Sequence, residues 1–199
     1  MNIDFFDINI CAITLDGISD RIIELTATSK RRFITYFNAH CLNLSFYDPE
    51  YKKIVKDADM VYAGGQGVVW ASRLLGIPLP ERVNILDFFD KLEERFIARK
   101  TRIYLLGGAK DVVKNTELVF RKRGLDIVGA RDGFFSREEE KDIIREINSL
   151  KPCLLMVGMG APKQEKWIYN NLNALDVNLC WAVGAAFECI SGYRKRAPR

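Results

Sequence analysis

Residues 103–109 read Ile103-Tyr104-Leu105-Leu106-Gly107-Gly108-Ala109, an apolar run that ends in two glycines. A short continuous apolar run is typical of a strand that is buried on both faces of a parallel sheet. Helical spacing begins directly after it, over 110–123, and glycines permit a tight turn between the two elements. Strand, turn and helix in this order predict a βαβ unit, and therefore an α/β fold with a mostly parallel sheet.

The same alternation extends from this stretch toward both ends of the chain. Further runs rich in β-branched and aromatic residues predict strands at 32–37, 59–62, 126–130, 153–157 and 178–183. Apolar residues at helical spacing predict helices at 17–28, 39–56, 66–75, 85–99, 137–149 and 162–173. Residues 3–13 alternate apolar and polar side chains, which indicates an N-terminal edge hairpin. We therefore expect a mostly parallel sheet flanked by helices.

Length and composition fit a single domain over residues 1–199. Of the 199 residues, 48% are hydrophobic and 28% are charged, which is enough to bury one sizeable core. The sequence has no run of about 18 apolar residues, and its N-terminus carries Asp4 and Asp7 rather than a basic signal segment. The five cysteines form no C-x-x-C pair and are expected to be buried free thiols. These features predict a cytoplasmic protein.

Glycines also follow two other predicted strands, at Gly64-Gly65-Gln66-Gly67 and at Gly158-Met159-Gly160. The carboxyl ends of parallel strands meet at one edge of an open sheet, and ligands bind at that edge. The helices that follow present free N–H groups and a positive dipole end, which favour phosphate. For one loop the need for a tight turn is an equally good explanation. Three such loops at one edge favour a nucleotide.

Polar side chains accompany these turns. Thr35 and Asn38 follow the end of a predicted strand, although helix capping explains Asn38 equally well. His40 is the only histidine, so a multi-histidine metal site is excluded, and either a lone general base or a structural residue remains open. Arg82 carries the planar fork that binds phosphate oxygens, but an exposed arginine after a proline turn is also common.

The third glycine turn continues into Pro162-Lys163-Gln164-Glu165. Pro162 suits the first turn of a helix, which places Lys163 and Gln164 where they could meet a diphosphate or a sugar. A dinucleotide-binding loop has a third glycine at the position that Lys163 occupies here. Such a protein also has an acidic residue after a later strand, where this chain has Arg131. An NAD(P)-dependent oxidoreductase is therefore the weaker interpretation.

Five motifs are distributed over nearly the whole chain. They are Thr35-x-x-Asn38, Gly65-x-Gly67-Val68-Val69-Trp70-Ala71-Ser72-Arg73-Leu74-Leu75-Gly76, Pro80-Glu81-Arg82-Val83, Gly158-x-Gly160-Ala161-Pro162-Lys163-Gln164-Glu165 and Lys195-Arg196-Ala197-Pro198. Together they resemble the WecG/TagA/CpsF glycosyltransferase family, glycosyltransferase family 26. The resemblance implies a Rossmann-like fold. It also implies transfer of N-acetylmannosamine, its uronic acid or a related sugar from UDP to a polyprenyl-diphosphate-linked sugar, in teichoic acid, common antigen or capsule synthesis.

The resemblance further implies which residues form the site. Thr35, Asn38, Arg82 and Gln164 would line the pocket, with Arg82 and the 158–164 loop near the donor diphosphate. Other substrate-binding positions are expected at Gly65, Gln66, Asp87, Gly107, Gly108, Gly158, Gly160, Pro162, Lys163 and Glu165. The UDP-sugar is a donor substrate, so no cofactor is expected, and no divalent metal is expected to be required.

At one position the chain departs from the family pattern. Similar proteins carry aspartate just before the glycine that matches Gly65, where a general base is expected, and this chain has Gly64. A glycine cannot accept a proton, so we expect catalysis to be impaired, with His40 or Asp87 as substitute bases. A non-catalytic sugar-nucleotide-binding homologue is a third interpretation.

The C-terminus departs from the pattern as well. The chain stops at Arg199, where family members continue into a basic, aromatic tail, so the sequence is expected to be a truncated core. Residues 194–199 concentrate basic charge, and each such residue near anionic lipid contributes about 1 kcal/mol, although a solvated tail is an equally good explanation. We expect a peripheral protein at the inner face of the membrane, with the lipid-linked acceptor and no nucleic acid as partner. A homo-oligomer stays open.

Overall fold

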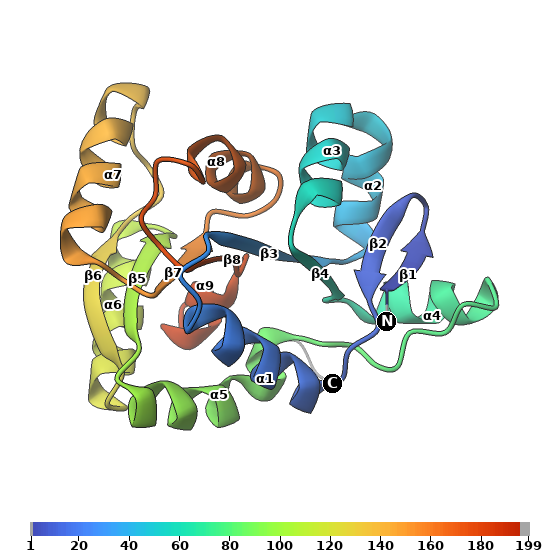
Figure 1. Ribbon diagram of the computed structural model, residues 1–199, viewed down its shortest axis with the longest axis horizontal. Coiled ribbons are helices and arrows are strands. Elements are labelled where there is room, and N and C mark those ends of the chain that lie inside the picture. The colour runs from blue at the N-terminus through green and yellow to red at the C-terminus, as the bar shows by residue number, and fades with distance from the viewer. Residues whose placement is uncertain (1, 196–199) are drawn as a thin grey trace.

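The structure is a computed structural model that describes residues 2–195. Its centre is an eight-stranded sheet (Figure 1). The strands are β1 (Asn2–Phe5), β2 (Ile8–Cys11), β3 (Arg32–Phe37), β4 (Met60–Ala63), β5 (Arg102–Gly107), β6 (Asp126–Arg131), β7 (Leu154–Gly158) and β8 (Leu179–Ala182). Their order in the sheet is β1-β2-β4-β3-β8-β7-β5-β6, and within the described residues the β1–β2 pairing alone is antiparallel. The predicted fold class and the N-terminal edge hairpin are confirmed.

The helices follow the predicted pattern with two differences. They are α1 (Leu15–Thr26), α2 (Ala39–Tyr47), α3 (Pro49–Asp57), α4 (Gln66–Leu74), α5 (Ile85–Arg99), α6 (Lys110–Lys122), α7 (Arg137–Leu150), α8 (Lys163–Asn171) and α9 (Ala186–Ile190). The single helix predicted over 39–56 is wrong, because Pro49 cannot continue α2 and instead opens α3. The short helix α9 was not predicted.

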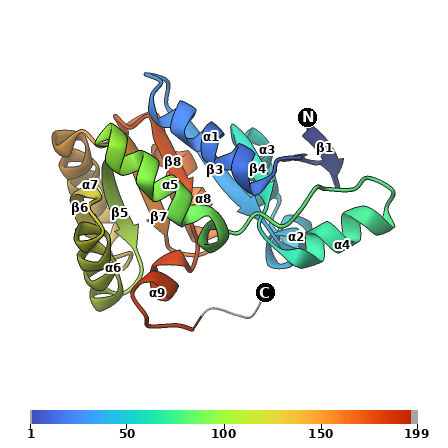
Figure 2. The same cartoon turned by 90° about the horizontal axis from the view of Figure 1, so that it is seen from below.

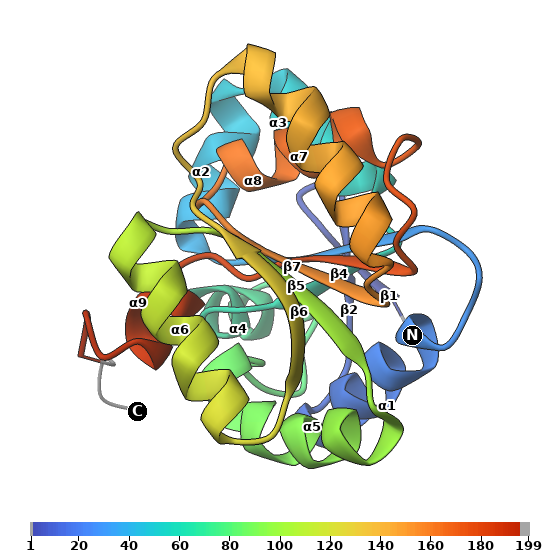
Figure 3. The ribbon, with the colours of Figure 1, turned by 90° about the vertical axis from the view of Figure 1, so that its left-hand side faces the viewer.

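Two helical layers cover the two faces of the sheet, and the alternation of strand residues explains both (Figure 3). Ile103 and Leu105 of β5 pack in the core beneath α1, α5, α6 and α9, whereas Tyr104 and Leu106 pack in the core beneath α3, α7 and α8. Both faces of the central strands are therefore buried, as their continuous apolar sequences require. A third cluster lies between the β1–β2 hairpin and helices α2, α3 and α4.

The parallel strands bring their carboxyl ends to one edge of the sheet. Phe37 of β3 is in register with Ala63 of β4, and Gly107 of β5 is in register with Gly158 of β7. The glycine turns therefore meet at this edge, as the sequence predicted. Viewed from below, helices α2, α4 and α9 lie along the same side of the molecule (Figure 2).

Two further expectations concern membrane spans and cysteines. Within residues 2–195, none of the helices is both long and apolar enough to cross a bilayer. All five cysteines are free thiols, of which Cys41 and Cys180 are buried and the other three are half-buried. Of the basic C-terminal segment, Arg194 and Lys195 are described, and residues 196–199 lie outside the described residues.

Candidate active site

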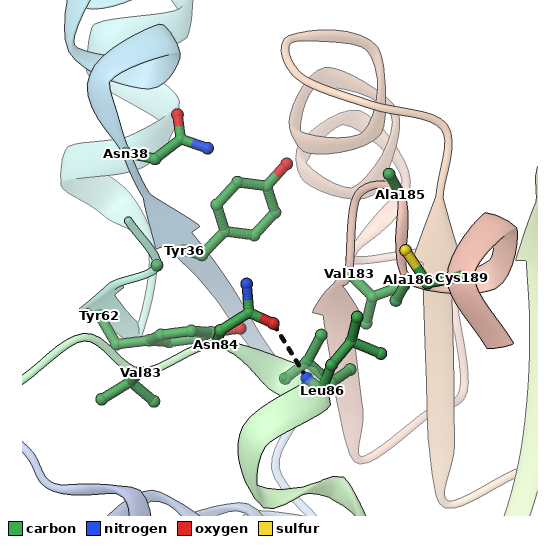
Figure 4. Close-up of a pocket in the computed structure, with 12 residues that line it drawn as sticks. Tyr36, Asn38, Tyr62, Val83, Asn84, Leu86, Val183, Ala185, Ala186 and Cys189 are labelled. Carbon is green, nitrogen blue, oxygen red and sulfur yellow. Dashed lines mark hydrogen bonds between the residues drawn. The ribbon is translucent and has the colours of Figure 1, made fainter. Parts of the chain in front are cut away.

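A cavity of about 200 Å³ opens at the carboxyl ends of β3, β4 and β8, and we call it the central cavity (Figure 4). It is lined by Tyr36, Asn38, Tyr62, Gly64, Val83, Asn84, Ile85, Leu86, Val183, Ala185, Ala186 and Cys189. Strands β3 and β8 are neighbours in the sheet although they lie at opposite ends of the sequence. The cavity therefore depends on the strand order and not on any local motif.

Asn38 and Gly64 occupy the wall formed by β3 and β4. The side-chain oxygen of Asn38 accepts a hydrogen bond from the Cys41 N–H at 3.0 Å, so Asn38 caps helix α2 and also lines the cavity. A Cβ atom added at Gly64 would lie 2.7 Å from the Cβ of Tyr36. An aspartate at position 64 thus requires Tyr36 to move. Asn38 is therefore both the helix cap and a lining residue of the cavity, and its contact with a substrate stays a prediction.

The two substitute bases predicted for Gly64 lie elsewhere. His40 is exposed on the first turn of α2 and does not line the central cavity. Asp87 has a side chain only 5% exposed and forms an ion pair of 3.0 Å with Arg82. The Asp87 carboxylate is therefore paired with the Arg82 guanidinium. Neither residue is among those that line the central cavity beside Gly64.

A second cavity of about 300 Å³ adjoins the first and contains the basic residues, and we call it the basic cavity. Arg82, Arg194 and Lys195 contribute to its lining. It shares Asn84, Leu86, Ala185 and Cys189 with the central cavity. Arg82 thus lies beside the central cavity, but in a different cavity from the 158–164 loop with which it was expected to bind the diphosphate, and its charge is partly balanced by Asp87.

A third cavity of about 380 Å³ lies at the ends of β5 and β7, and we call it the glycine cavity. Gly108, Gly158, Gly160 and Lys163 line it, as the glycine motifs predicted. The Lys163 ammonium donates to the Gly133 carbonyl at 2.6 Å, which leaves two of its three N–H bonds for other acceptors. Gly107 lies below the cavity, where a Cβ would approach the Gly158 carbonyl oxygen to 2.3 Å. This close approach of the two strand ends requires glycine.

Three of the helices that start at these cavities lack capping side chains, whereas α2 and α5 are capped by Asn38 and Asn84 of the central cavity. Gly65, Ala109 and Pro162 occupy the N-cap positions of α4, α6 and α8, and none provides a side-chain cap. By contrast, Thr14 and Ser136 cap α1 and α7, which start away from the cavities, and the predicted capping box at Ser136 is confirmed. Uncapped N–H groups and the positive end of the helix dipole together attract anions. The carboxyl edge of the sheet is therefore suited to a phosphate group.

The structure does not place Thr35, Gln164 and Glu165 in the lining of the three cavities, where they were predicted. All three are fully buried, and they form a network beneath the loops. The Glu165 Oε1 atom accepts from the Thr35 hydroxyl at 2.9 Å and from the Gln164 amide at 2.7 Å. The Gln164 oxygen accepts in turn from the Gly160 N–H at 3.2 Å and the Gly184 N–H at 3.0 Å. The network joins β3 to the loops after β7 and β8.

Burial controls the charge of Glu165. Removal of water from its carboxyl group raises its pKa above the ordinary value of 4.5, and the hydrogen bonds from Gln164 and Thr35 oppose this shift. The second carboxyl oxygen has no hydrogen-bond partner among the described residues. A buried carboxyl group with one unpartnered oxygen favours its neutral, protonated form.

Several residues that line the central cavity were not predicted from the sequence. The Tyr36 ring projects from β3 across the cavity toward the loop that carries Val183 and Ala185 (Figure 4). Burial raises the pKa of Tyr36, which therefore keeps its proton. Tyr62 forms part of the floor and its oxygen accepts from the Trp181 indole at 2.9 Å. Tyr36 stands between Thr35 and Asn38, so its place beside that motif was the available signal.

The sequence is similar to those of known proteins over most of its length. The sequence model of the glycosyl transferase WecG/TagA/CpsF family matches residues 3–199. An "N-acetylglucosaminyldiphosphoundecaprenol N-acetyl-beta-D-mannosaminyltransferase" from Staphylococcus aureus strain NCTC 8325 / PS 47 is 30% identical over 83% of the chain. The protein of the same name from strain MRSA252 is 29% identical over the same share. The chain spans 65% of the length of these two relatives. With a match over nearly its full length, the chain belongs to the WecG/TagA/CpsF glycosyltransferase family.

Proposed function

We propose that the protein transfers N-acetylmannosamine, its uronic acid or a related sugar from UDP to a polyprenyl-diphosphate-linked sugar for a cell-surface polysaccharide. The observation that carries the proposal is the family match over residues 3–199 together with the cavities where its motifs converge. The printed name of the Staphylococcus aureus relatives supports the sugar and the lipid-linked acceptor. Teichoic acid, common antigen and capsule are the candidate polymers.

The donor is assigned to the glycine cavity. Gly108 and Gly160 allow a diphosphate to approach the backbone, and the uncapped N-termini of α6 and α8 provide N–H donors. Lys163 lies on the wall of the same cavity. The glycine cavity and the central cavity share Ala185, so a sugar linked to the diphosphate can extend from one into the other. The acceptor then approaches through the central cavity.

The reaction forms one bond and breaks another at the anomeric carbon. The acceptor hydroxyl oxygen bonds to that carbon, the bond to the UDP oxygen breaks, and UDP leaves with the electron pair. Helix N-termini and Lys163 are assigned to stabilise the charge on UDP, and Arg82 lines the separate basic cavity. The acceptor proton requires a base, and position 64 lies in the wall of the central cavity. With glycine there, we expect the proton transfer to limit the rate.

Replacement of this glycine tests the proposal. Gly64→Asp is expected to raise the turnover of UDP-N-acetylmannosamine with a polyprenyl-diphosphate-linked N-acetylglucosamine acceptor by roughly 100- to 10,000-fold, the range typical of a general base. Gly64→Asn is the matched control, since it makes the same steric demand on Tyr36 without a proton acceptor. Radiolabel transfer measures turnover, and thermal unfolding checks that both variants fold.

Two results would count against transfer. If neither the aspartate nor the asparagine variant turns over while both bind the UDP-sugar, the protein is a non-catalytic sugar-nucleotide-binding homologue. The glycine at position 64 is the specific observation that favours this second candidate. If none of the three proteins binds a UDP-sugar, the assignment of the donor fails.

A further inference from the structure

Helix α4 exposes an apolar face to solvent. Trp70 is 60% exposed and Leu74, one turn later on the same face, is 89% exposed. Leu75 follows directly and is 53% exposed. The opposite face packs into the protein through Val68 and Val69. We call Trp70, Leu74 and Leu75 the α4 patch. Three adjacent large apolar side chains this exposed indicate an interaction surface, which binds either another protein or a membrane.

The α4 patch stands next to the candidate active site. The N-cap of α4 is Gly65, which follows Gly64 in the wall of the central cavity. From there the helix runs outward along the end of the molecule that carries the β1–β2 hairpin (Figures 1 and 2). A surface that covers the patch is thereby held close to the central cavity.

The segment that carries the patch has charge of one sign. The sequence has no acidic residue from Gln66 to Pro80, and Arg73 of α4 is exposed beside Leu74. Arg194 and Lys195 line the basic cavity, which shares four residues with the central cavity. An exposed tryptophan among leucines and basic residues matches the boundary between the head groups and acyl chains of an anionic bilayer.

The size of the α4 patch argues against a second copy of the chain. A large aromatic side chain buries roughly 150–250 Å², and all three members of the patch are already partly buried. Even three such side chains fall short of the roughly 800 Å² per partner that a standard protein interface buries. A bilayer has no such minimum, because the apolar side chains enter it one by one.

We propose that α4 docks the protein on an anionic lipid bilayer, with Trp70 and Leu74 entering the head-group boundary. The choice of a bilayer rests on the proposed function, whose acceptor is a membrane lipid. Docking through α4 would present the central cavity to a lipid-linked acceptor in the plane of the membrane.

Tryptophan fluorescence provides a direct test, because Trp70 is the exposed member of three tryptophans. Trp167 is 8% exposed and Trp181 is fully buried. Vesicles that contain phosphatidylglycerol are expected to shift the emission to shorter wavelength, and acyl-chain quenchers in the same vesicles are expected to reduce it. Vesicles of phosphatidylcholine alone should bind about tenfold more weakly, and high salt should weaken binding to phosphatidylglycerol.

Substitution separates the patch from the rest of the surface. Trp70→Gln with Leu74→Gln is expected to weaken co-sedimentation with phosphatidylglycerol vesicles by about tenfold or more, because apolar burial is lost. Leu118→Gln is the matched control, since Leu118 is 56% exposed on α6 at the far side of the molecule (Figure 1). It should bind vesicles like the unsubstituted protein. Thermal unfolding checks the fold of each variant.

The outcomes distinguish this proposal from the proposed function. Unchanged vesicle binding after substitution of the α4 patch, or no vesicle binding by the unsubstituted protein, overturns docking by α4. A dimer in sedimentation velocity that the double substitution dissociates would assign the patch to a second copy and would also overturn it. If the protein binds vesicles through α4 but no UDP-sugar, docking stands and the proposed function fails.

Discussion

Glu165 has no exposed surface, although it belongs to a motif that is typical of a ligand-binding loop. Its carboxyl group joins Thr35 of β3 to Gln164 of α8, and Gln164 holds the backbone of Gly160 and Gly184. These residues therefore set the positions of two loops that line the cavities. Their contribution to binding is expected to be indirect, through loop geometry.

The protonation of Glu165 yields a prediction about pH. Because burial raises the pKa of Glu165 in the folded protein above the ordinary 4.5, the folded chain holds a proton that the unfolded chain releases. The free energy of unfolding should therefore fall as pH rises above about 4.5, by up to about 1.4 kcal/mol per pH unit, until the folded pKa is reached. Glu165→Gln carries no such proton and should lack this part of the decline.

Urea unfolding of both proteins at several pH values between 5 and 8 measures the effect. The difference between the two proteins cancels the contribution of every other titrating group. We expect the glutamine variant to gain stability relative to the unsubstituted protein as pH rises. Identical pH dependence would show that Glu165 is ionised in the folded state.

At the scale of elements, the boundary between α2 and α3 is set by two residues. Pro49 lies at the first turn of α3, and the Asp48 carboxylate accepts from the Tyr51 N–H at 2.9 Å as its N-cap. Lys166 of α8 lies 2.8 Å from the same carboxylate, and its hydrogen bond holds the pKa of Asp48 below the ordinary value. The boundary thus also connects α3 to α8.

Substitution of Asp48 separates capping from ion pairing. Asp48→Ala removes both and should lower the free energy of unfolding by about 1 kcal/mol or somewhat more, chiefly through the lost cap. Asp48→Asn keeps a capping oxygen and removes the charge, so it should cost less than half as much. Urea midpoints measure both. An equal loss in the two variants would assign the stabilisation to the pair with Lys166.

The sequence predicts most elements because their patterns are local. The run Ile103–Leu106 is apolar on both faces, and Ser136 with Glu139 forms the capping box that begins α7. Pro49 was the available signal for the break between α2 and α3, but the helical spacing continues across it. Helix α9 spans only Ala186–Ile190, too short for a periodic pattern to appear.

At the scale of the whole molecule, the candidate site depends on contacts that no local pattern specifies. Glycine turns predicted which edge of the sheet binds a ligand, but not that β3 lies beside β8. That pairing places Tyr36 opposite Val183 in the central cavity. Whether the Gln164 side chain points into the protein or into a cavity likewise depends on how α8 packs on β3. Asn38, Gly64 and Gly108 were predictable because they directly follow strands, and Lys163 was predictable because it begins the helix after β7.

Thermal unfolding with UDP, UDP-N-acetylmannosamine, NAD and NADP shows whether this edge of the sheet binds a UDP-sugar. A ligand at about 100 times its dissociation constant adds roughly 2.7 kcal/mol of stability, which corresponds to roughly 5–10 °C for a domain of this size. We predict that the two UDP ligands raise the unfolding temperature by this amount and that the nicotinamide nucleotides leave it unchanged. A rise with NAD or NADP alone, or no rise with either UDP ligand, would contradict the account.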